Sequence, residues 1–207
     1  MTFELNRTTE RNRWMLEEVQ SHIAHQLNTL VNNGKSEAYV IVGNAGLYQT
    51  VFAVSSSTTP TATILTDDDS RVVNARAEGR PVAELLWNLG LASADGQLLG
   101  QCRRNDVVQL NRWPNFTRIH ATPNSLKIAA LLSSRATSPV LASRILDLDE
   151  AEVFSFYSAA ASAGYAQVLN RTAVQEIRSP SVNPMRQSLI SRLMTHLKSL
   201  QMQRKAA

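Results

Sequence analysis

Glu18, His22 and His25 are the first residues along the chain whose types and spacing could do chemistry. They stand four and then three residues apart, so a helix would place all three on one face. A carboxylate with two imidazoles could bind zinc, but the His-Glu-x-x-His order of zinc peptidases is absent. We therefore interpret them as part of a solvated helix face.

Three other groups have residue types found in metal, nucleophile or phosphate sites, but each lacks the rest of the motif that defines such a site. Asp67–Asp69 could attract a hard cation, yet neither the spacing nor the glycine of an EF-hand follows. Cys102 is the only cysteine, and it has no familiar nucleophile motif around it. Gly43–Gly46 follows a predicted strand without the further residues of a phosphate loop. The sequence thus implies no enzymatic activity, and we expect no metal and no cofactor.

A small basic and aromatic group is the one candidate ligand patch. It comprises Arg103, Arg104, Arg112 and Trp113. Guanidinium groups beside an aromatic ring could hold an anionic ligand, and a solvated surface is the alternative.

The elements that must position these residues begin with a helix predicted from Thr9 to Asn33, where apolar residues recur every three or four positions and Gly34 ends the pattern. Its apolar stripe must dock on a domain or pair with a second copy. Short runs rich in β-branched residues then predict antiparallel strands. These runs are Ala38–Gly43, Tyr48–Val54, Thr61–Thr66, Arg71–Ala75 and Val107–Leu110. A helix is predicted from Pro81 to Leu91.

The fold class that follows is α+β, with a small antiparallel sheet and helices in the first half and a helical second half. Two prolines break the pattern between Asn111 and Asn124, which predicts a domain boundary there. The predicted parts are an α+β domain at 1–112, a helical domain at 122–178 and an amphipathic helix at 184–204.

The most specific pattern lies between Ser138 and Val153. Ser138 and Pro139 form a helix start, Asp147 marks a turn, and Asp149 caps a second helix. This spacing resembles the helix-turn-helix of winged-helix proteins, with a preceding helix at Ser125–Ser134 and a wing strand at Tyr165–Asn170. The turn position usually held by glycine is here an aspartate.

The second helix of this unit, Asp149–Ala163, lacks what DNA reading needs. The resemblance implies that it would enter the major groove, where Lys, Arg, Asn and Gln contact bases and phosphates. It contains none of these types, and its first turn carries Glu150 and Glu152. We therefore expect the unit to serve protein contacts, with nucleic acid binding less favoured.

A strongly amphipathic helix is predicted after Asn183 and Pro184. Its apolar stripe includes Leu189, Leu193, Leu197 and Leu200, and its cations include Arg186, Arg192 and Lys198. There is no acidic residue from Ile177 to Ala207. We expect the leucines to pack against protein, in a homo-oligomer or on a partner; an anionic surface is the alternative.

Composition limits the class of protein further. The 207 residues are 43% hydrophobic and 18% charged, with a net charge of +4, which is typical of a folded globular chain. No apolar run approaches the roughly 20 residues that span a bilayer, and no signal peptide is evident. We expect a cytoplasmic, non-enzymatic, bacterial-type regulatory or adaptor protein that self-associates. The alternative is a DNA-binding transcriptional regulator that uses the wing and the basic tail.

Overall fold

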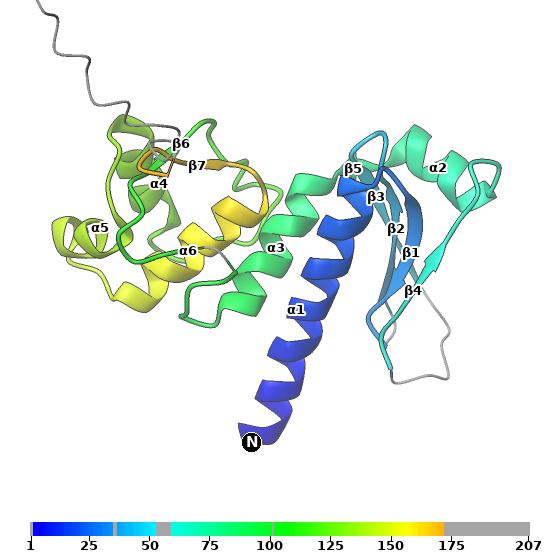
Figure 1. Cartoon of the computed structure of the whole chain (residues 1–207), viewed down its shortest axis with the longest axis horizontal. Coiled ribbons are helices and arrows are strands. Elements are labelled where there is room, and N and C mark those ends of the chain that lie inside the picture. Colours follow the sequence, from blue (N-terminus) through cyan, green and yellow to red (C-terminus); the bar gives the residue numbers. More distant parts are fainter. Residues whose placement is uncertain (1, 35–36, 53–58, 101, 172–207) are drawn as a thin grey trace, which may run out of the picture. The chain divides into compact units, whose positions relative to one another are not determined.

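A five-stranded antiparallel sheet forms the first half of the chain (Figure 1). The computed structural model describes residues 2–34, 37–52, 59–100 and 102–171, with side chains described from Thr8 onward. The sheet order is β4-β1-β2-β3-β5. Its strands are β1 (Asn28–Asn32), β2 (Glu37–Val42), β3 (Leu47–Phe52), β4 (Thr61–Ile64) and β5 (Arg80–Pro81). Strands are confirmed at Ala38–Gly43, at Thr61–Thr66 and in the described part of Tyr48–Val54, whereas Arg71–Ala75 is not a strand.

Helices cover both faces of this sheet. On one face Val31 and Ile41 pack against α1 (Thr2–Ala24), which also contacts α3 (Val82–Ala94). On the other face Val40 and Val42 pack against α2 (Ser70–Glu78). Adjacent residues of one strand point to opposite faces, so a continuous apolar run such as β2 serves both layers.

Helix α1 ends nine residues before the predicted end. The chain leaves the helix after Ala24, and Gln26 takes a left-handed conformation with a φ of 57°. Leu30 and Val31, which fit the helical stripe by spacing, lie instead in β1, where both neighbouring strands satisfy their backbone groups. The remaining stripe docks on the same chain: Met15 and Val19 are buried.

Residues Arg71–Ala75 are helical, so the prediction of a strand there is wrong. The Asp69 side chain accepts a hydrogen bond from the backbone N–H of Arg71 and caps α2. Val72 and Ala75, three positions apart, face the sheet together. Asp69 as a capping residue was the sequence signal for a helix, whereas the adjacent Val72 and Val73 favoured the prediction of a strand.

Three further helices and a two-stranded sheet complete the described chain. They are β6 (Val108–Leu110), α4 (Ser125–Ser134), α5 (Pro139–Leu146), α6 (Glu150–Ser162) and β7 (Ala166–Val168), with β6 and β7 antiparallel. The bounds of α4 match the predicted ones, and α3 runs three residues beyond the predicted Leu91.

One core joins the helical half to α1 and the sheet. Trp87 of α3 is fully buried and meets Phe156 of α6 edge-on, with ring centroids 5.2 Å apart. At Gly90 a Cβ would come within 3.1 Å of Ala159, so the missing side chain lets α3 and α6 approach closely. Residues Met1–Asn170 form one compact unit, and the boundary predicted at 111–124 lies inside it.

No helix among the described residues is long and apolar enough to cross a membrane. The predicted helix at 184–204 and the residues singled out on it lie outside the described residues. These residues are Leu189, Leu193, Leu197, Leu200, Arg186, Arg192 and Lys198.

Candidate functional site

Helices α5 and α6, joined by three residues, occupy the segment with the most specific sequence pattern. The Ser138 side chain accepts a hydrogen bond from the backbone N–H of Leu141 at 3.3 Å and caps α5. Asp147 ends α5 in a left-handed conformation with a φ of 52°. Asp149 accepts from the backbone N–H of Ala151 at 2.9 Å and caps α6. The predicted caps are confirmed, and the aspartate adopts the conformation that glycine would take with less strain.

Helix α6 is enclosed by the rest of the unit. Eight of its 13 residues, Val153 to Ala160, are buried, and the other five are half-buried. It contacts α3, α4, α5 and β7. A helix in the major groove needs one face free of protein along its length, and the eight buried residues in the middle of α6 offer none.

The two glutamates at the start of α6 are held by neighbouring residues. Glu150 pairs with Arg104, with an oxygen to nitrogen distance of 2.5 Å. Glu152 accepts from the backbone N–H of Asn124 and from its side-chain amide at 2.9 Å. Burial raises the pKa of the Glu152 carboxyl, but hydrogen bonds from Asn124 and Thr122 outweigh it and the pKa lies below its ordinary value. Glu152 therefore stays charged and fixes the chain that leads into α4.

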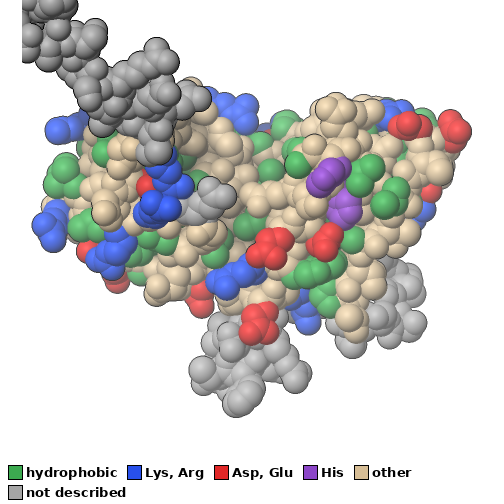
Figure 2. Space-filling view, viewed as in Figure 1, with side chains coloured by type: hydrophobic (Ala, Val, Ile, Leu, Met, Phe, Trp, Pro, Cys, Tyr) green, Lys and Arg blue, Asp and Glu red, His purple; other side chains and the backbone are tan. Residues whose placement is uncertain are grey.

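Helix α5 presents an apolar face to solvent. Leu141 and Ile145, four residues apart on one side of the helix, are 47% and 45% exposed. Arg144 beside them is exposed and forms no ion pair with the described residues. Figure 2 shows hydrophobic and basic side chains interspersed on the surface of the half that holds α4–α6. We name Leu141, Arg144 and Ile145 the α5 surface.

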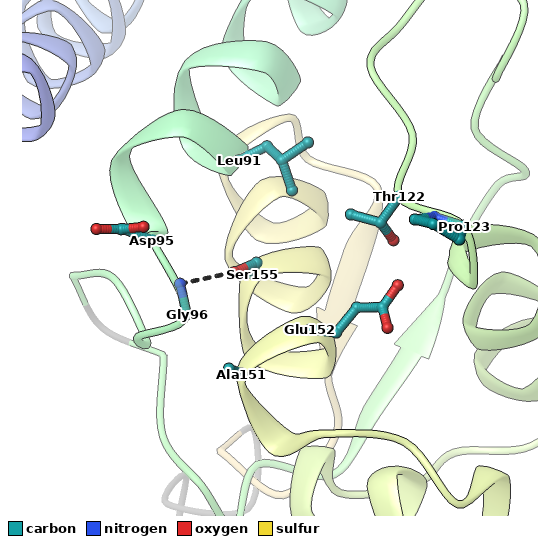
Figure 3. A pocket seen from close by; sticks show the side chains of 8 residues that line it. All are labelled: Leu91, Asp95, Gly96, Thr122, Pro123, Ala151, Glu152 and Ser155. Carbon is teal, nitrogen blue, oxygen red and sulfur yellow. Dashed lines mark hydrogen bonds between the residues drawn. The ribbon is translucent and has the colours of Figure 1, made fainter. Parts of the chain in front are cut away.

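A cavity of about 570 Å³ lies between the end of α3, the start of α6 and the Thr122–Pro123 segment (Figure 3). Its polar groups are engaged inside the chain: Ser155 accepts from the backbone N–H of Gly96 at 2.9 Å, and Glu152 bonds Asn124. The Asp95 carboxylate points away from Glu152 and Thr122 in Figure 3. The cavity thus lacks the converging free polar groups by which a ligand site orients its ligand.

The predicted anion patch is divided between the two ends of α6. Arg104 pairs with Glu150 and lies 5.2 Å from the centre of the Phe154 ring, near the start of α6. Arg112 lies 4.3 Å from the centre of the Tyr165 ring, beyond the end of that helix. The structure does not bring these two guanidiniums together.

The other two members of the patch stay with their sequence neighbours. The backbone N–H of Arg103 donates to Asp106. Trp113 is 52% exposed, and its ring meets Phe116 edge-on.

Two buried polar clusters were missed by the sequence reasoning. Glu84, 4% exposed, accepts from Arg80 at 2.6 Å and lies 3.6 Å from Arg118. The four-residue spacing of Arg80 and Glu84 was a usable signal, whereas Arg118 comes from a distant loop.

The second cluster joins Tyr157 to Asp106. The phenol donates to the carboxylate at 2.6 Å, and both residues are buried. Burial and this hydrogen bond raise the pKa of the Tyr157 phenol, with Cys102 as a further neighbour. Because 51 residues separate the partners, no local pattern could reveal the pair.

The groups first considered for chemistry are held in local interactions. His22 lies 3.6 Å from Glu18, and His25 is within hydrogen-bonding distance of the Ser21 carbonyl. Asp67 bonds Arg76 and Asn28. Among the described residues, no three His, Cys, Asp or Glu side chains gather as a metal site would require.

Comparison with known proteins found no match. No family model, no curated protein and no solved structure is similar to this chain.

Proposed function

We propose that this chain is a non-enzymatic, bacterial-type regulatory or adaptor protein that acts through protein–protein contacts and self-association. The observation that supports this most is the contrast between α6, whose eight central residues are buried, and the exposed apolar side chains of α5. A unit whose second helix is internal offers partners its first helix instead.

The winged-helix-like reading of residues 122–178 is part of this proposal. Helices α4, α5 and α6 followed by β7 have the order that the reading requires, and β6 pairs with β7. In a DNA-binding member the second helix would carry the base contacts. Here the burial of α6 and the pairing of Glu150 with Arg104 support a packing role for it.

The α5 surface suits a partner of a definable kind. Leu141 and Ile145 would each lose exposed apolar area on binding, which favours association by about 25 cal/mol per Å². Arg144 would meet an acidic group on the rim of the contact. The partner we propose is therefore a protein with an apolar ridge and a neighbouring carboxylate.

The test uses the whole chain with Leu141→Asp and Ile145→Asp combined, and Val73→Asp as the matched control. Val73 is 52% exposed on α2, so it takes the same chemical change on another helix. We expect a partner cross-linked in the host cell to be lost with the double variant and kept with the control. Equal recovery from both variants would contradict the α5 surface.

DNA binding through the wing and the basic tail is the second candidate, and charge distribution favours it. Residues 1–170 hold 14 of the 21 basic residues and 16 of the 17 acidic ones, whereas residues 171–207 hold seven basic residues and one acidic. Such a tail would bind phosphates without sequence preference and with strong salt dependence.

Replacing Glu150 and Glu152 with Gln tests whether α6 reads DNA, which neither candidate requires; the salt dependence of binding to random duplex DNA separates the two candidates. We expect any affinity for duplex DNA to stay unchanged or rise, because two negative charges are removed near the phosphates. Loss of sequence-specific binding in this variant would show that α6 reads DNA and would overturn the proposal.

A further inference from the structure

Strand β4 is an open edge of the main sheet (Figure 1). All four of its residues, Thr61 to Ile64, are exposed, and Ile64 is 65% exposed. No described segment pairs with its outer side. From Thr59 to Thr66 the chain carries no charged residue, so the edge lacks the lysines and glutamates that commonly block pairing with another strand.

The direction of its backbone groups follows from the pairing with β1. The N–H of Leu65 donates to the carbonyl of Asn28 at 2.8 Å, and the register places Thr63 opposite Leu30. Backbone groups alternate in direction along an antiparallel strand, so Thr61, Thr63 and Leu65 bond toward β1. Ala62 and Ile64 therefore direct their N–H and C=O groups outward.

We propose that β4 pairs with β4 of a second copy of this chain, antiparallel, about a twofold axis at Thr63. In that register Ala62 lies opposite Ile64 of the second copy, and each such pair exchanges two hydrogen bonds. The twofold axis repeats the exchange, so four backbone groups per strand become paired. The two sheets then form one ten-stranded sheet with both α1 helices on the same face.

The side chains favour a second copy over another partner. Directly opposed residues of an antiparallel pair share a face, so the Ile64 side chain meets Ala62 on the α1 face and Thr63 meets Thr63 on the α2 face. Thr–Thr pairs are favourable in sheets, and this register opposes no like charges. An acidic or basic peptide would find no counter-charge on the strand. The other sheet edge, β5, has two residues and continues directly into α3.

The inference rests on the self-association within the proposed function, but it does not depend on the α5 surface. Loss of the α5 partner would leave β4 pairing intact, and a monomer would leave the α5 surface intact. The two proposals can therefore fail separately.

Cysteine cross-linking of the full chain tests the twofold axis directly. In a Cys102→Ser background, Thr63→Cys places two thiols at a non-hydrogen-bonded pair, where Cα atoms lie about 4.5 Å apart and a disulfide can form. Thr61→Cys is the matched control on the same exposed face, because its Cα atoms would be about 14 Å apart in this register. We expect a disulfide-linked dimer from Thr63→Cys and none from Thr61→Cys.

Sedimentation equilibrium tests the edge without a cross-link. Ile64→Lys should raise the dimer dissociation constant by at least about tenfold, because it opposes a charge to an apolar edge. Ala62→Pro, which removes an outward N–H, should act likewise. Val73→Lys, which places the same charge on α2, should leave the dimer unchanged. Three results would overturn the proposal. The chain could be monomeric at micromolar concentration, cross-linking could be equal at positions 63 and 61, or the dimer could survive both Ile64→Lys and Ala62→Pro.

Discussion

Helices α5 and α6 are separated by three residues and lie in opposite environments. Helix α6 is enclosed by four other elements, whereas α5 leaves Leu141 and Ile145 almost half exposed. Both helices begin with a capping side chain, Ser138 for α5 and Asp149 for α6. The difference shows that packing against a distant element, here α3, decides which helix of such a pair is buried and which keeps exposed apolar side chains.

The largest expected effect is on the free energy of unfolding, when a buried side chain of α6 is truncated. The matched truncation on the exposed face of α5 should have little effect. Phe156→Ala should lower the free energy of unfolding by about 3 to 5 kcal/mol, because the ring is fully buried against Trp87. Leu141→Ala should change it by less than about 0.5 kcal/mol. Urea unfolding of the full chain measures both, and equal losses would remove the contrast.

Tyr157→Phe removes the hydrogen bond that this α6 side chain donates to Asp106. We expect a smaller loss of stability from it. The Asp106 carboxylate, 2% exposed, would lose a donor and keep the Arg103 backbone N–H. We expect the free energy of unfolding to fall by about 1 to 3 kcal/mol. A double-mutant cycle with Asp106→Asn measures the coupling, and additive losses would contradict the pair.

The turn between the two helices should respond in opposite directions at two positions. Asp147→Gly should raise the free energy of unfolding by about 0.5 to 1 kcal/mol, because glycine adopts the left-handed conformation with less strain. Asp149→Ala should lower it by about 1 kcal/mol through loss of the α6 cap. A melting temperature that falls with Asp147→Gly would contradict this account of the turn.

The smallest effect concerns the start of α2, in the sheet half. Hydrogen bonds from the side chain and backbone of Arg71 lower the pKa of Asp69 to about 2. A lowered pKa means that this carboxylate stabilises the fold above about pH 4, and that its contribution is lost as the pH falls toward 2. NMR titration should give that pKa, and Arg71→Ala should move it back toward 4. An unchanged pKa in the variant would exclude the Arg71 side chain as the main cause, since the backbone N–H of residue 71 is kept.

Residues close together in the sequence predicted most helices and strands. Contacts between residues far apart in the sequence decided how those elements pack. The caps at Ser138 and Asp149 and the bounds of α4 follow from residues within four positions of each other. The prediction of a helix as far as Asn33 was wrong because Leu30 and Val31 fit both a helical stripe and a strand. Only the pairing of β1 with β2 and β4 distinguishes the two.

The candidate site was predictable to a lesser degree. That α6 lacks DNA-contacting residues could be read from the sequence, but its enclosure depends on α3, about 70 residues earlier. Arg104 and Arg112 are close in sequence, and strand β6 carries them to opposite ends of α6. Sequence proximity cannot report such a separation.

The order in which the two apolar clusters are completed has a consequence for synthesis on the ribosome. The apolar layer between α2 and the sheet is complete once residues 30 to 75 have emerged, whereas Trp87 must wait for Phe156 and Tyr165. During that interval the tryptophan and the neighbouring faces of α1 and α3 remain without their final partners. Because domains generally fold as units during synthesis, a nascent chain stalled near residue 120 should be open to protease at α3, and one stalled after Tyr165 has left the exit tunnel should resist it.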